Sequence, residues 1–456
     1  MQLTYTSSHL VKNNIKSTKK RYTDSSDHIF SCINSMEGNL KDSKPIEYCL
    51  FCGTETNSIL KLSPTPPANE LLEVQCTQDT FPLNMVKCIS CNHLQLDTSV
   101  DKERLYRHYL YCSDTSQSNR IYFESYANQM IERFFKEEGG QPQAQVLDIA
   151  SNDGLFLSYF KKQGFDVLGV DPAKNLAAVA KEKDVKTLSE FFNEKVAEDI
   201  LKIHGKFQLI TCNNAFAHND DLRPILNGVK TLLADDGTFV VEVQYAMRML
   251  EQGTFDLLYH EHLHCHHLTP LVKFFENNGL RIYDAEEVAT GWGSLRIYAA
   301  HSSTTFRSGN KFSRTKTMED LLQYERDSFD KLLTPFAAKI EANKNKLISL
   351  LKKIKAEDKT ISVLGHPARA MTLSYYFGLN DGIITDVFDD NALKIGRYAP
   401  CTKKPILSTS DIGSKKPDYL LILSWNYAEA MMKTHEEYRK AGGRFIVPLP
   451  ECKVIE

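Results

Sequence analysis

The chain has 456 residues, of which 42% are hydrophobic and 25% charged, and its formal net charge is -3. This length and composition predict two or three globular domains, and the small negative charge excludes a general basic field that would draw the chain onto nucleic acid. No window approaches the run of about 18 apolar residues that a membrane-spanning helix needs, so we expect neither a membrane nor a nucleic-acid partner.

The first segment, residues 1–45, is rich in Ser, Lys, Asn and Asp and has no apolar signal core. It is predicted to be a flexible extension, with a short helix or strand docked on a neighbouring domain as the alternative. Eleven cysteines without a targeting segment are typical of a reducing compartment, so a cytoplasmic location is expected.

Two CxxC motifs mark the next unit, residues 46–110. Cys49 and Cys52 form the first motif, and Cys88 and Cys91 form the second. Four thiolates in two such pairs predict a tetrahedral zinc site, against the alternative of four unrelated buried cysteines. Because four protein ligands leave no open position, the zinc is expected to be structural. Few basic side chains lie near these motifs, which argues against a nucleic-acid-binding zinc ribbon.

Residues 111–310 have the alternating strand and helix pattern of a nucleotide-cofactor domain. A buried strand ends at Asp148, a turn with Asn152 and Gly154 opens a helix, and a second strand ends at Asp171. Acids at the ends of adjacent parallel strands are placed for a cofactor's amino-acid end and ribose, although each alone can also cap a following helix.

The turn has one glycine where a dinucleotide site would have GxGxxG, which favours S-adenosylmethionine over NAD. A fourth strand, residues 208–212, ends shortly before Asn214 and His218, so both are expected near the cofactor methyl group or the substrate. A helix over residues 222–233, a turn at 235–237 and a strand at 238–243 continue the alternation.

The run Tyr259-His260-Glu261-His262 brings together a phenol, a carboxylate and two imidazoles. Histidine suits a general base near neutral pH, and a neighbouring carboxylate can hold its tautomer. Because alternate positions of an extended segment share a face, four alternating histidines up to His266 offer a metal site as the rival interpretation. The flanking His264, His266 and His267 are otherwise expected in a solvated or hydrogen-bonded loop.

Two further units complete the chain. Apolar stripes predict a helical hairpin over 317–356, within a connector at residues 311–358 that joins the core to the last domain. Residues 359–456 alternate strand and helix again, without an acid-terminated cofactor pattern that can be claimed. A later strand carrying Gly293, Ser294 and Arg296 is expected beside the pocket, with a surface or ion-pair residue as the alternative for Arg296.

Ordered motifs over residues 46–456 resemble the S-adenosylmethionine-dependent sugar C-methyltransferases, which methylate carbon 3 of nucleotide-linked 4-keto-deoxysugars. They include the four cysteines, Pro64-Thr-Pro-Pro-Ala-Asn69, Tyr109-Leu-Tyr-Cys-Ser113 with Ser116, Ser151-Asn-Asp-Gly154, Asn213-Asn-Ala-Phe-Ala-His218, the Tyr259–His262 run, Gly293-Ser-Leu-Arg296, Ile361-Ser-Val-Leu-Gly365 with Pro367-Ala-Arg369, 389–394, Ser424-Trp-Asn426, and 442–443 to 448–450. The resemblance implies an α/β protein: a class I methyltransferase core with an N-terminal zinc-binding module and a C-terminal Rossmann-like domain.

The resemblance also implies a role for each site residue. His262 would remove the proton next to the ketone, with Glu261 and Tyr259 as its supports, and the C-terminal domain would hold the nucleotide. The expected partner is a nucleotide-linked keto sugar, and the chain is expected to be a monomer or homodimer. Three positions depart from the family pattern, at His366 with Arg369, at Pro400-Cys401 and at 264–267, so the sugar or nucleotide can differ.

Three other functions stay open on the sequence alone. The same fold can methylate an oxygen, a nitrogen or another carbon of a different small molecule. A non-catalytic zinc and Rossmann binding protein is the second, although the intact Tyr259, Glu261 and His262 argue against it. A zinc-dependent regulator of nucleic acid is the least favoured.

Overall fold

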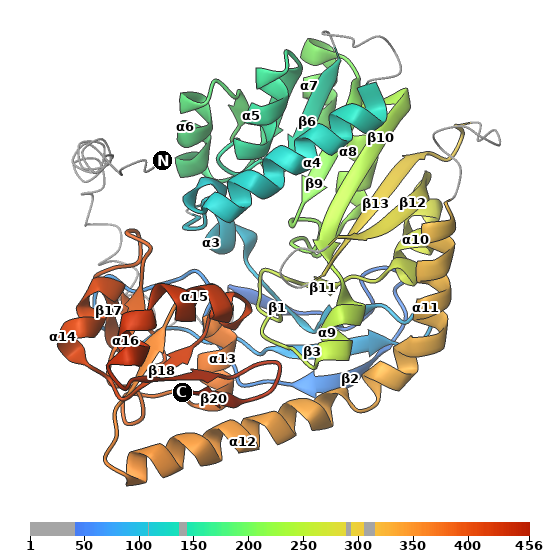
Figure 1. The fold of residues 1–456 in the computed structure, drawn as a ribbon. Helices are drawn as coiled ribbons and strands as arrows, with labels where there is room; N and C mark the ends of the chain where they lie inside the picture. Colours follow the sequence, from blue (N-terminus) through green and yellow to red (C-terminus); the bar gives the residue numbers. More distant parts are fainter. Residues whose placement is uncertain (1–41, 108, 136–143, 289–292, 305–314) are drawn as a thin grey trace.

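The computed structural model describes residues 42–107, 109–135, 144–288, 293–304 and 315–456. They form a cysteine module (residues 43–106), a central domain (residues 113–301) and a C-terminal domain (residues 361–455), which pack against one another (Figure 1). Two long helices, α11 (Lys316–Leu333) and α12 (Phe336–Ala356), join the last two. None of the described helices is long and apolar enough to cross a membrane.

The central domain is built on a seven-stranded sheet in the part of the chain that the structure describes. Its order is β12 (Leu280–Val288), β13 (Ser294–His301), β10 (Leu233–Gln244), β9 (Phe207–Asn213), β6 (Gln145–Ile149), β7 (Asp166–Val170) and β8 (Thr187–Leu188). All neighbours are parallel except those of β13. Strand order reverses at β6, so a ligand site is expected at the carboxyl ends of β6, β7 and β9.

Helices cover both faces of this sheet because successive strand residues point in opposite directions. Val146 packs with α4 (Gln117–Phe135), α5 (Leu155–Lys162) and α6 (Lys174–Glu182). Its neighbour Leu147 packs with α7 (Glu194–His204), α8 (Arg223–Leu232) and α10 (Leu268–Asn277). The predicted Rossmann-like core is confirmed, although the turn predicted at 235–237 is an irregularity inside β10.

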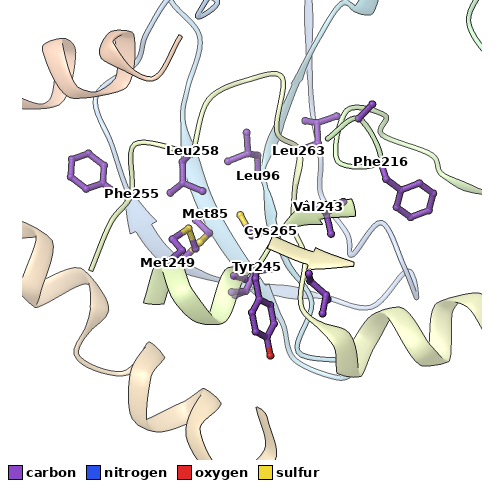
Figure 2. Close-up of a cluster of buried hydrophobic side chains, with 14 of the residues drawn as sticks. Met85, Leu96, Phe216, Val243, Tyr245, Met249, Phe255, Leu258, Leu263 and Cys265 are labelled. Atoms are coloured by element: carbon purple, nitrogen blue, oxygen red, sulfur yellow. The ribbon is translucent and has the colours of Figure 1, made fainter. Parts of the chain in front are cut away.

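The cysteine module is not an independent domain, because its sheet includes a strand from the central domain. Its sheet has the order β11-β4-β3-β2, with β2 (Thr56–Lys61), β3 (Asn84–Cys88) and β4 (Leu94–Leu96). The edge strand β11 (His264–Cys265) comes from the central domain and pairs antiparallel with β4. Figure 2 shows Met85 and Leu96 of the module beside Val243, Met249 and Cys265 of the central domain.

The predicted N-terminal extension needs one correction. Its residues up to 41 lie outside the described part of the chain. Ser43–Pro45, by contrast, form β1, which pairs antiparallel with β5 (Thr98–Val100). The last residues of the segment are therefore a docked strand, as the alternative interpretation had it. The module ends in α3 (Lys102–Tyr106), which is followed by the short 3-10 turn Ser113–Thr115.

The C-terminal domain has a second seven-stranded sheet within the described residues. Its order is β16 (Tyr398–Ala399), β17 (Lys404–Ser408), β15 (Val387–Asp389), β14 (Ile361–Leu364), β18 (Tyr419–Ile422), β19 (Arg444–Val447) and β20 (Lys453–Ile455). The strands from β17 to β19 are parallel and the two edge strands are antiparallel. The helices are α13 (Ala370–Phe377), α14 (Ile412–Lys415), α15 (Ala428–Thr434) and α16 (Glu436–Lys440). The predicted Rossmann-like domain is confirmed.

One cofactor-like feature of this domain escaped the sequence analysis. β15 ends at Asp389, whose carboxylate accepts a 2.7 Å hydrogen bond from the backbone N–H of His366, just after β14. Gly365 precedes it at a φ of +80°, and a Cβ there would meet the Ser424 hydroxyl at 2.3 Å. The turn after β14 is therefore built like the turn after β6, with an acid on the adjacent strand.

The predicted helical hairpin is only partly right. Both helices exist, but α11 lies along the edge of the central domain, and α12 runs off at an angle beneath the C-terminal domain (Figure 1). Buried Glu325 anchors α11, because its carboxylate accepts from the N–H groups of Leu268 and Thr269 at 2.6 and 2.7 Å. It also accepts from the Tyr245 hydroxyl at 3.0 Å, at the end of β10.

Candidate active site

The four predicted zinc ligands come together in the structure. Their sulfurs lie within 4.8 Å of one another, the one such group of metal-binding side chains found among the described residues. The Cys52–Cys88 distance is 3.4 Å, and Cys91 lies 3.6 Å from both Cys49 and Cys52. Because Zn–S bonds of about 2.3 Å place tetrahedral sulfurs about 3.8 Å apart, the cluster fits zinc with little adjustment. The hydrogen bond between Cys49 and Cys91 lowers the pKa of the Cys49 thiol and raises that of the Cys91 thiol.

Tyr259 and His262 lie in a loop, residues 254–263, that runs from α9 (Ala246–Gln252) to β11. His262 Nδ1 is 2.9 Å from the carbonyl oxygen of Leu257, and because a carbonyl only accepts, Nδ1 carries the hydrogen. Nε2 of the neutral ring is then an acceptor, and the Tyr259 hydroxyl donates to it at 2.9 Å. The lone pair on Nε2 is the basic site of the loop.

Burial keeps this imidazole neutral. His262 is 6% exposed, and burial, opposed by the Leu257 hydrogen bond, lowers its pKa to about 4. Burial also raises the pKa of Tyr259 well above its usual range, so the phenol stays protonated. At neutral pH the pair is a free base beside a hydrogen-bond donor, which is the state needed to accept a proton from a substrate.

Glu261 sits differently from the prediction. Its carboxylate does not hold the His262 tautomer, which is fixed by Leu257. The Asn69 amide donates to Glu261 Oε1 at 2.7 Å, and the Tyr109 hydroxyl donates to Oε2 at 2.6 Å. Burial raises the pKa of Glu261 to about 7, against the lowering effect of the Tyr109 and Asn69 hydrogen bonds. The module's 64–69 motif and the segment after α3 therefore deliver the two donors that hold the carboxylate.

A second imidazole, His218, faces the first. Its ring stacks on His262 with centroids 5.3 Å apart, and on Tyr106 of α3 at 5.4 Å with an interplanar angle of 10°. Burial lowers the pKa of His218 well below its usual range, and Nε2 is buried with no hydrogen-bond partner. This nitrogen lies in the loop after β9 and can form a hydrogen bond with a bound ligand. Tyr106 could not be singled out from the sequence, because one tyrosine in a helix carries no pattern of its own.

The predicted cofactor acids end adjacent strands at the carboxyl edge. Asp148 accepts from the Thr211 hydroxyl at 2.6 Å and from the Asn213 amide at 3.3 Å, and burial raises its pKa to about 7. Asp171 accepts from the backbone N–H groups of Asn152 and Ala173, both at 2.8 Å. Burial raises the pKa of Asp171 as well. Asp171 thus ties the turn at Asn152 to the residue before α6, and Asp148 is held from β9.

The turn itself fits a cofactor without a pyrophosphate. Gly154 has a φ of +72°, and a Cβ there would lie 3.0 Å from Ala180, so the position needs glycine. Asn152, at a φ of +52°, donates from its amide to Tyr111 O at 3.2 Å and accepts from Ser113 N–H at 3.0 Å. The 111–113 segment therefore covers the turn. Asn214 has a φ of +54° and follows β9 directly.

The flanking histidines are not a metal site and are not solvated. His264, His266 and His267 are all buried. His264 lies 2.8 Å from His93 and 2.8 Å from the carbonyl of Asn219, and its ring stacks on His266. His267 stacks on Phe329 of α11. They are buried because β11 joins the sheet of the cysteine module. The alternating histidines therefore pack at the boundary between the cysteine module and the central domain.

A pocket opens next to His262 on the central-domain side. It is lined by Asn214, Ala217, Val243, Gln244, Tyr245, Ala246, Met249, Thr254, Leu257, Leu258, His262, His264, Cys265, His266 and Gly293. Its lining combines aliphatic side chains such as Val243, Met249 and Leu257 with polar groups from Asn214, Gln244, Tyr245, Thr254, His262, His264 and His266. Arg296 of β13 lies outside the lining, in a buried ion pair with Glu242 at 2.8 Å and over the Tyr126 ring. Its ion-pair interpretation is the correct one, in the core and not at the surface.

Three family models match the chain. A zinc binding domain matches residues 49–106, a methyltransferase domain matches 118–285, and a C-methyltransferase C-terminal domain matches 289–450. C-methyltransferase NovU of Streptomyces niveus is 32% identical over 419 residues, which are 90% of this chain and 97% of that protein. Ubiquinone biosynthesis O-methyltransferase of Acinetobacter baylyi is 25% identical over 27% of this chain and 58% of its own length.

Solved structures match over a smaller part. An S-adenosylmethionine-dependent methyltransferase of Clostridium acetobutylicum is 16% identical, with a TM-score of 0.32 over 39% of this chain and 92% of that one. The magnesium protoporphyrin IX methyltransferase of Synechocystis, with bound S-adenosylmethionine, is 14% identical, with a TM-score of 0.30 over 40% of this chain and 79% of that one.

Proposed function

The chain belongs to the S-adenosylmethionine-dependent C-methyltransferases that carry an N-terminal zinc-binding domain, and we propose that it methylates the carbon next to the ketone of a nucleotide-linked 4-keto-deoxysugar. The observation that carries the proposal is the neutral His262, whose Nδ1–H is donated to Leu257 and whose Nε2 is an acceptor, facing the Tyr259 hydroxyl. Carbon methylation needs such a base, because a carbon acid must first give up its proton.

In the proposed reaction, His262 Nε2 takes the proton from the carbon next to the ketone. The electron pair of that C–H bond moves to the carbonyl oxygen, and the hydroxyl of Tyr259 stabilises the developing enolate. Bound S-adenosylmethionine supplies an electrophilic methyl group on a sulfonium. The substrate carbon attacks this group in line, so the methyl is inverted and S-adenosylhomocysteine leaves. Before proton transfer both His218 and His262 are neutral, so neither imidazole repels the positive sulfonium when the cofactor binds.

For the cofactor, we propose that Asp148 binds the amino-acid end and Asp171 the ribose, with Asn152, Gly154, Asn214 and His218 around them. The position of both acids at the carboxyl edge of adjacent parallel strands, on either side of the tight Gly154 turn, supports this placement. The C-terminal domain would hold the nucleotide of the substrate, at the turn between β14 and α13.

S-adenosylmethionine binding is expected to strengthen as the pH rises from 6 to 8. Burial raises the pKa of Asp148 to about 7, and the cofactor's ammonium group prefers the ionised carboxylate. Below pH 7 the carboxyl of Asp148 must therefore lose its proton when the cofactor binds. The affinity rises as the pH passes 7 and levels off once Asp148 is already ionised in the free enzyme. Calorimetric titration at several pH values measures the slope. Asp148→Asn should bind more weakly and lose most of the slope, whereas an unchanged slope would remove Asp148 from the cofactor site.

Tyr109→Phe is expected to lower kcat and to move its acidic limb to higher pH. The Tyr109 hydroxyl donates to Glu261 and lowers the pKa of that carboxyl, so its removal lets burial raise the pKa further. If the ionised carboxylate is the active form, a larger fraction of enzyme is inactive at pH 7. The kcat profile between pH 5 and 9 is the measurement. Tyr159→Phe, which removes a hydroxyl bonded to the Arg120 carbonyl instead, serves as the control and should keep the wild-type profile.

Product analysis tests the proposed reaction against its rivals. The enzyme is incubated with S-adenosylmethionine carrying a labelled methyl group and with a panel of nucleotide-linked 4-keto sugars. The proposal expects the label on the carbon next to the ketone, with one S-adenosylhomocysteine formed per product. A label on oxygen or nitrogen would favour another class I methyltransferase activity. No consumption of S-adenosylmethionine with any keto sugar would favour a binding protein.

A further inference from the structure

The 254–263 loop is held from the C-terminal domain as well as from the cysteine module. The side of α13 and of the turn before α15 that faces the central domain reaches this loop (Figure 1). Phe255 packs on Tyr376 and Phe377 of α13, and the hydrogen bonds from the C-terminal domain fall on Asp256 and Leu258, which stand on either side of Leu257 in the chain. Leu257 is the residue whose carbonyl accepts from His262 Nδ1.

The first contact is made by the side chain of Asp256, which is fully buried. Its Oδ2 accepts from the indole N–H of Trp425 at 2.8 Å, and the guanidinium of Arg369 lies 3.4 Å away. The Arg369 side chain is only 13% exposed, so the ion pair is shielded from water. The Asp256 side chain is therefore fixed in orientation. Turning it away would leave a buried carboxylate without the indole and guanidinium that hold it, which is costly.

The second contact is made by Thr372 in the first turn of α13. Its hydroxyl donates to the carbonyl oxygen of Leu258 at 2.7 Å, and its side chain is fully buried. The peptide between Leu257 and Leu258 is held inside the loop, because the Leu258 N–H donates to the Phe255 carbonyl at 2.9 Å. Asp256 before this peptide and the Leu258 carbonyl after it are bonded to the C-terminal domain, so the turn that directs the Leu257 carbonyl is fixed at both ends from that domain.

From these contacts we propose that Asp256, Thr372 and Trp425 are positioning residues, through which the docked C-terminal domain sets the tautomer and the aim of His262. The inference rests on the proposed function, in which Nε2 of His262 is the base. It gives the C-terminal domain a part in the chemistry besides any part in holding the substrate's nucleotide. The base is complete only when the two domains are in contact. The cysteine module acts on a different residue of the loop, because its Asn69 holds Glu261.

The test is the variant Thr372→Val, which removes the hydroxyl and keeps the shape of the side chain. Thr402→Val is the matched control, because Thr402 is also buried in the C-terminal domain and donates to a backbone carbonyl, that of Ala399, at 3.3 Å. Histidine labelled with 15N reports the tautomer of each ring by NMR without substrate. The His262 signal is assigned by its loss in His262→Asn.

We expect Thr372→Val to convert the single Nδ1–H tautomer of His262 into a mixture and to lower kcat about 10- to 100-fold, with S-adenosylmethionine affinity within about twofold. Thr402→Val should keep both the signal and kcat. If Thr372→Val does not fold, Trp425→Phe removes the donor to Asp256 and is expected to give the same two changes. Unchanged nitrogen signals and kcat in a folded variant overturn the inference. Full turnover by His262→Asn would overturn the proposed base instead, so the two failures are distinguishable.

Discussion

Replacing His262 with asparagine is expected to lower methyl transfer by about 1,000-fold, because a general base contributes typically 10²–10⁴-fold and His262 Nε2 is the acceptor that the Tyr259 hydroxyl faces. S-adenosylmethionine binding should stay within about twofold of wild type, since the acids proposed for the cofactor lie on β6 and β7. Turnover is measured by S-adenosylhomocysteine formation, and cofactor binding by calorimetry.

The control is His260→Asn in the same loop. His260 is also buried, but its Nε2 donates to the Pro82 carbonyl at 3.1 Å and its ring packs against Phe81. This variant removes an imidazole from the loop without touching the base, so its kcat should stay within a few-fold of wild type. Retained turnover in His262→Asn, or an equal loss in both variants, would contradict the assignment.

Removing the zinc is expected to abolish activity as well as to destabilise the protein. In Cys88→Ala three sulfurs remain, so a tetrahedral site with four protein ligands is no longer possible. A structural zinc contributes about 10–16 kcal/mol of apparent binding free energy in zinc-finger peptides, so much of the cysteine module's order depends on it. The module holds the active site through the β4–β11 pair and the Asn69–Glu261 hydrogen bond. Metal content, thermal unfolding and turnover are measured together.

Cys76→Ala is the matched control, because Cys76 lies between the two CxxC motifs in sequence and outside the four-sulfur cluster. It should keep one zinc per chain and wild-type turnover. In the wild type, a chelator should remove zinc and activity in parallel, and added zinc should restore both. A zinc-free protein with full turnover would show that the cysteine module is not needed to hold the 254–263 loop.

The parts of the site that could be predicted are those set by local spacing. Two CxxC motifs place their sulfurs within reach of one ion, whatever the rest of the chain does. Asp148 and Asp171 each end a strand, and parallel neighbours bring strand ends to one edge, so their proximity follows from the strand pattern. The same reasoning should have found Asp389, but β15 has only three residues and shows no periodicity in the sequence.

Long-range contacts could not be predicted from the sequence. Asn69 and Glu261 are 192 residues apart, and Thr372 and Leu258 are 114 apart. The local sequence around these residues gives no indication of which distant residue each one will contact. The Leu257 carbonyl could not be predicted as the group that fixes the tautomer of His262, because every residue has a carbonyl. The neighbouring carboxylate of Glu261 was the only side chain in the run suited to that role. The histidines after His262 were expected in a solvated or hydrogen-bonded loop, and their burial could not be foreseen, because a two-residue strand that joins another module's sheet leaves no signal in the sequence.

Hydrogen exchange at the substrate carbon tests the central claim, that His262 removes the proton next to the ketone. The enzyme is incubated in D₂O with S-adenosylhomocysteine, which fills the cofactor site without a methyl group, and with a nucleotide-linked 4-keto-deoxysugar that it methylates. Deuterium at the carbon next to the ketone is followed by NMR. The account predicts that the wild-type enzyme speeds this exchange well above the rate without enzyme, and that His262→Asn leaves it at that background rate. Exchange at the wild-type rate in His262→Asn would contradict it.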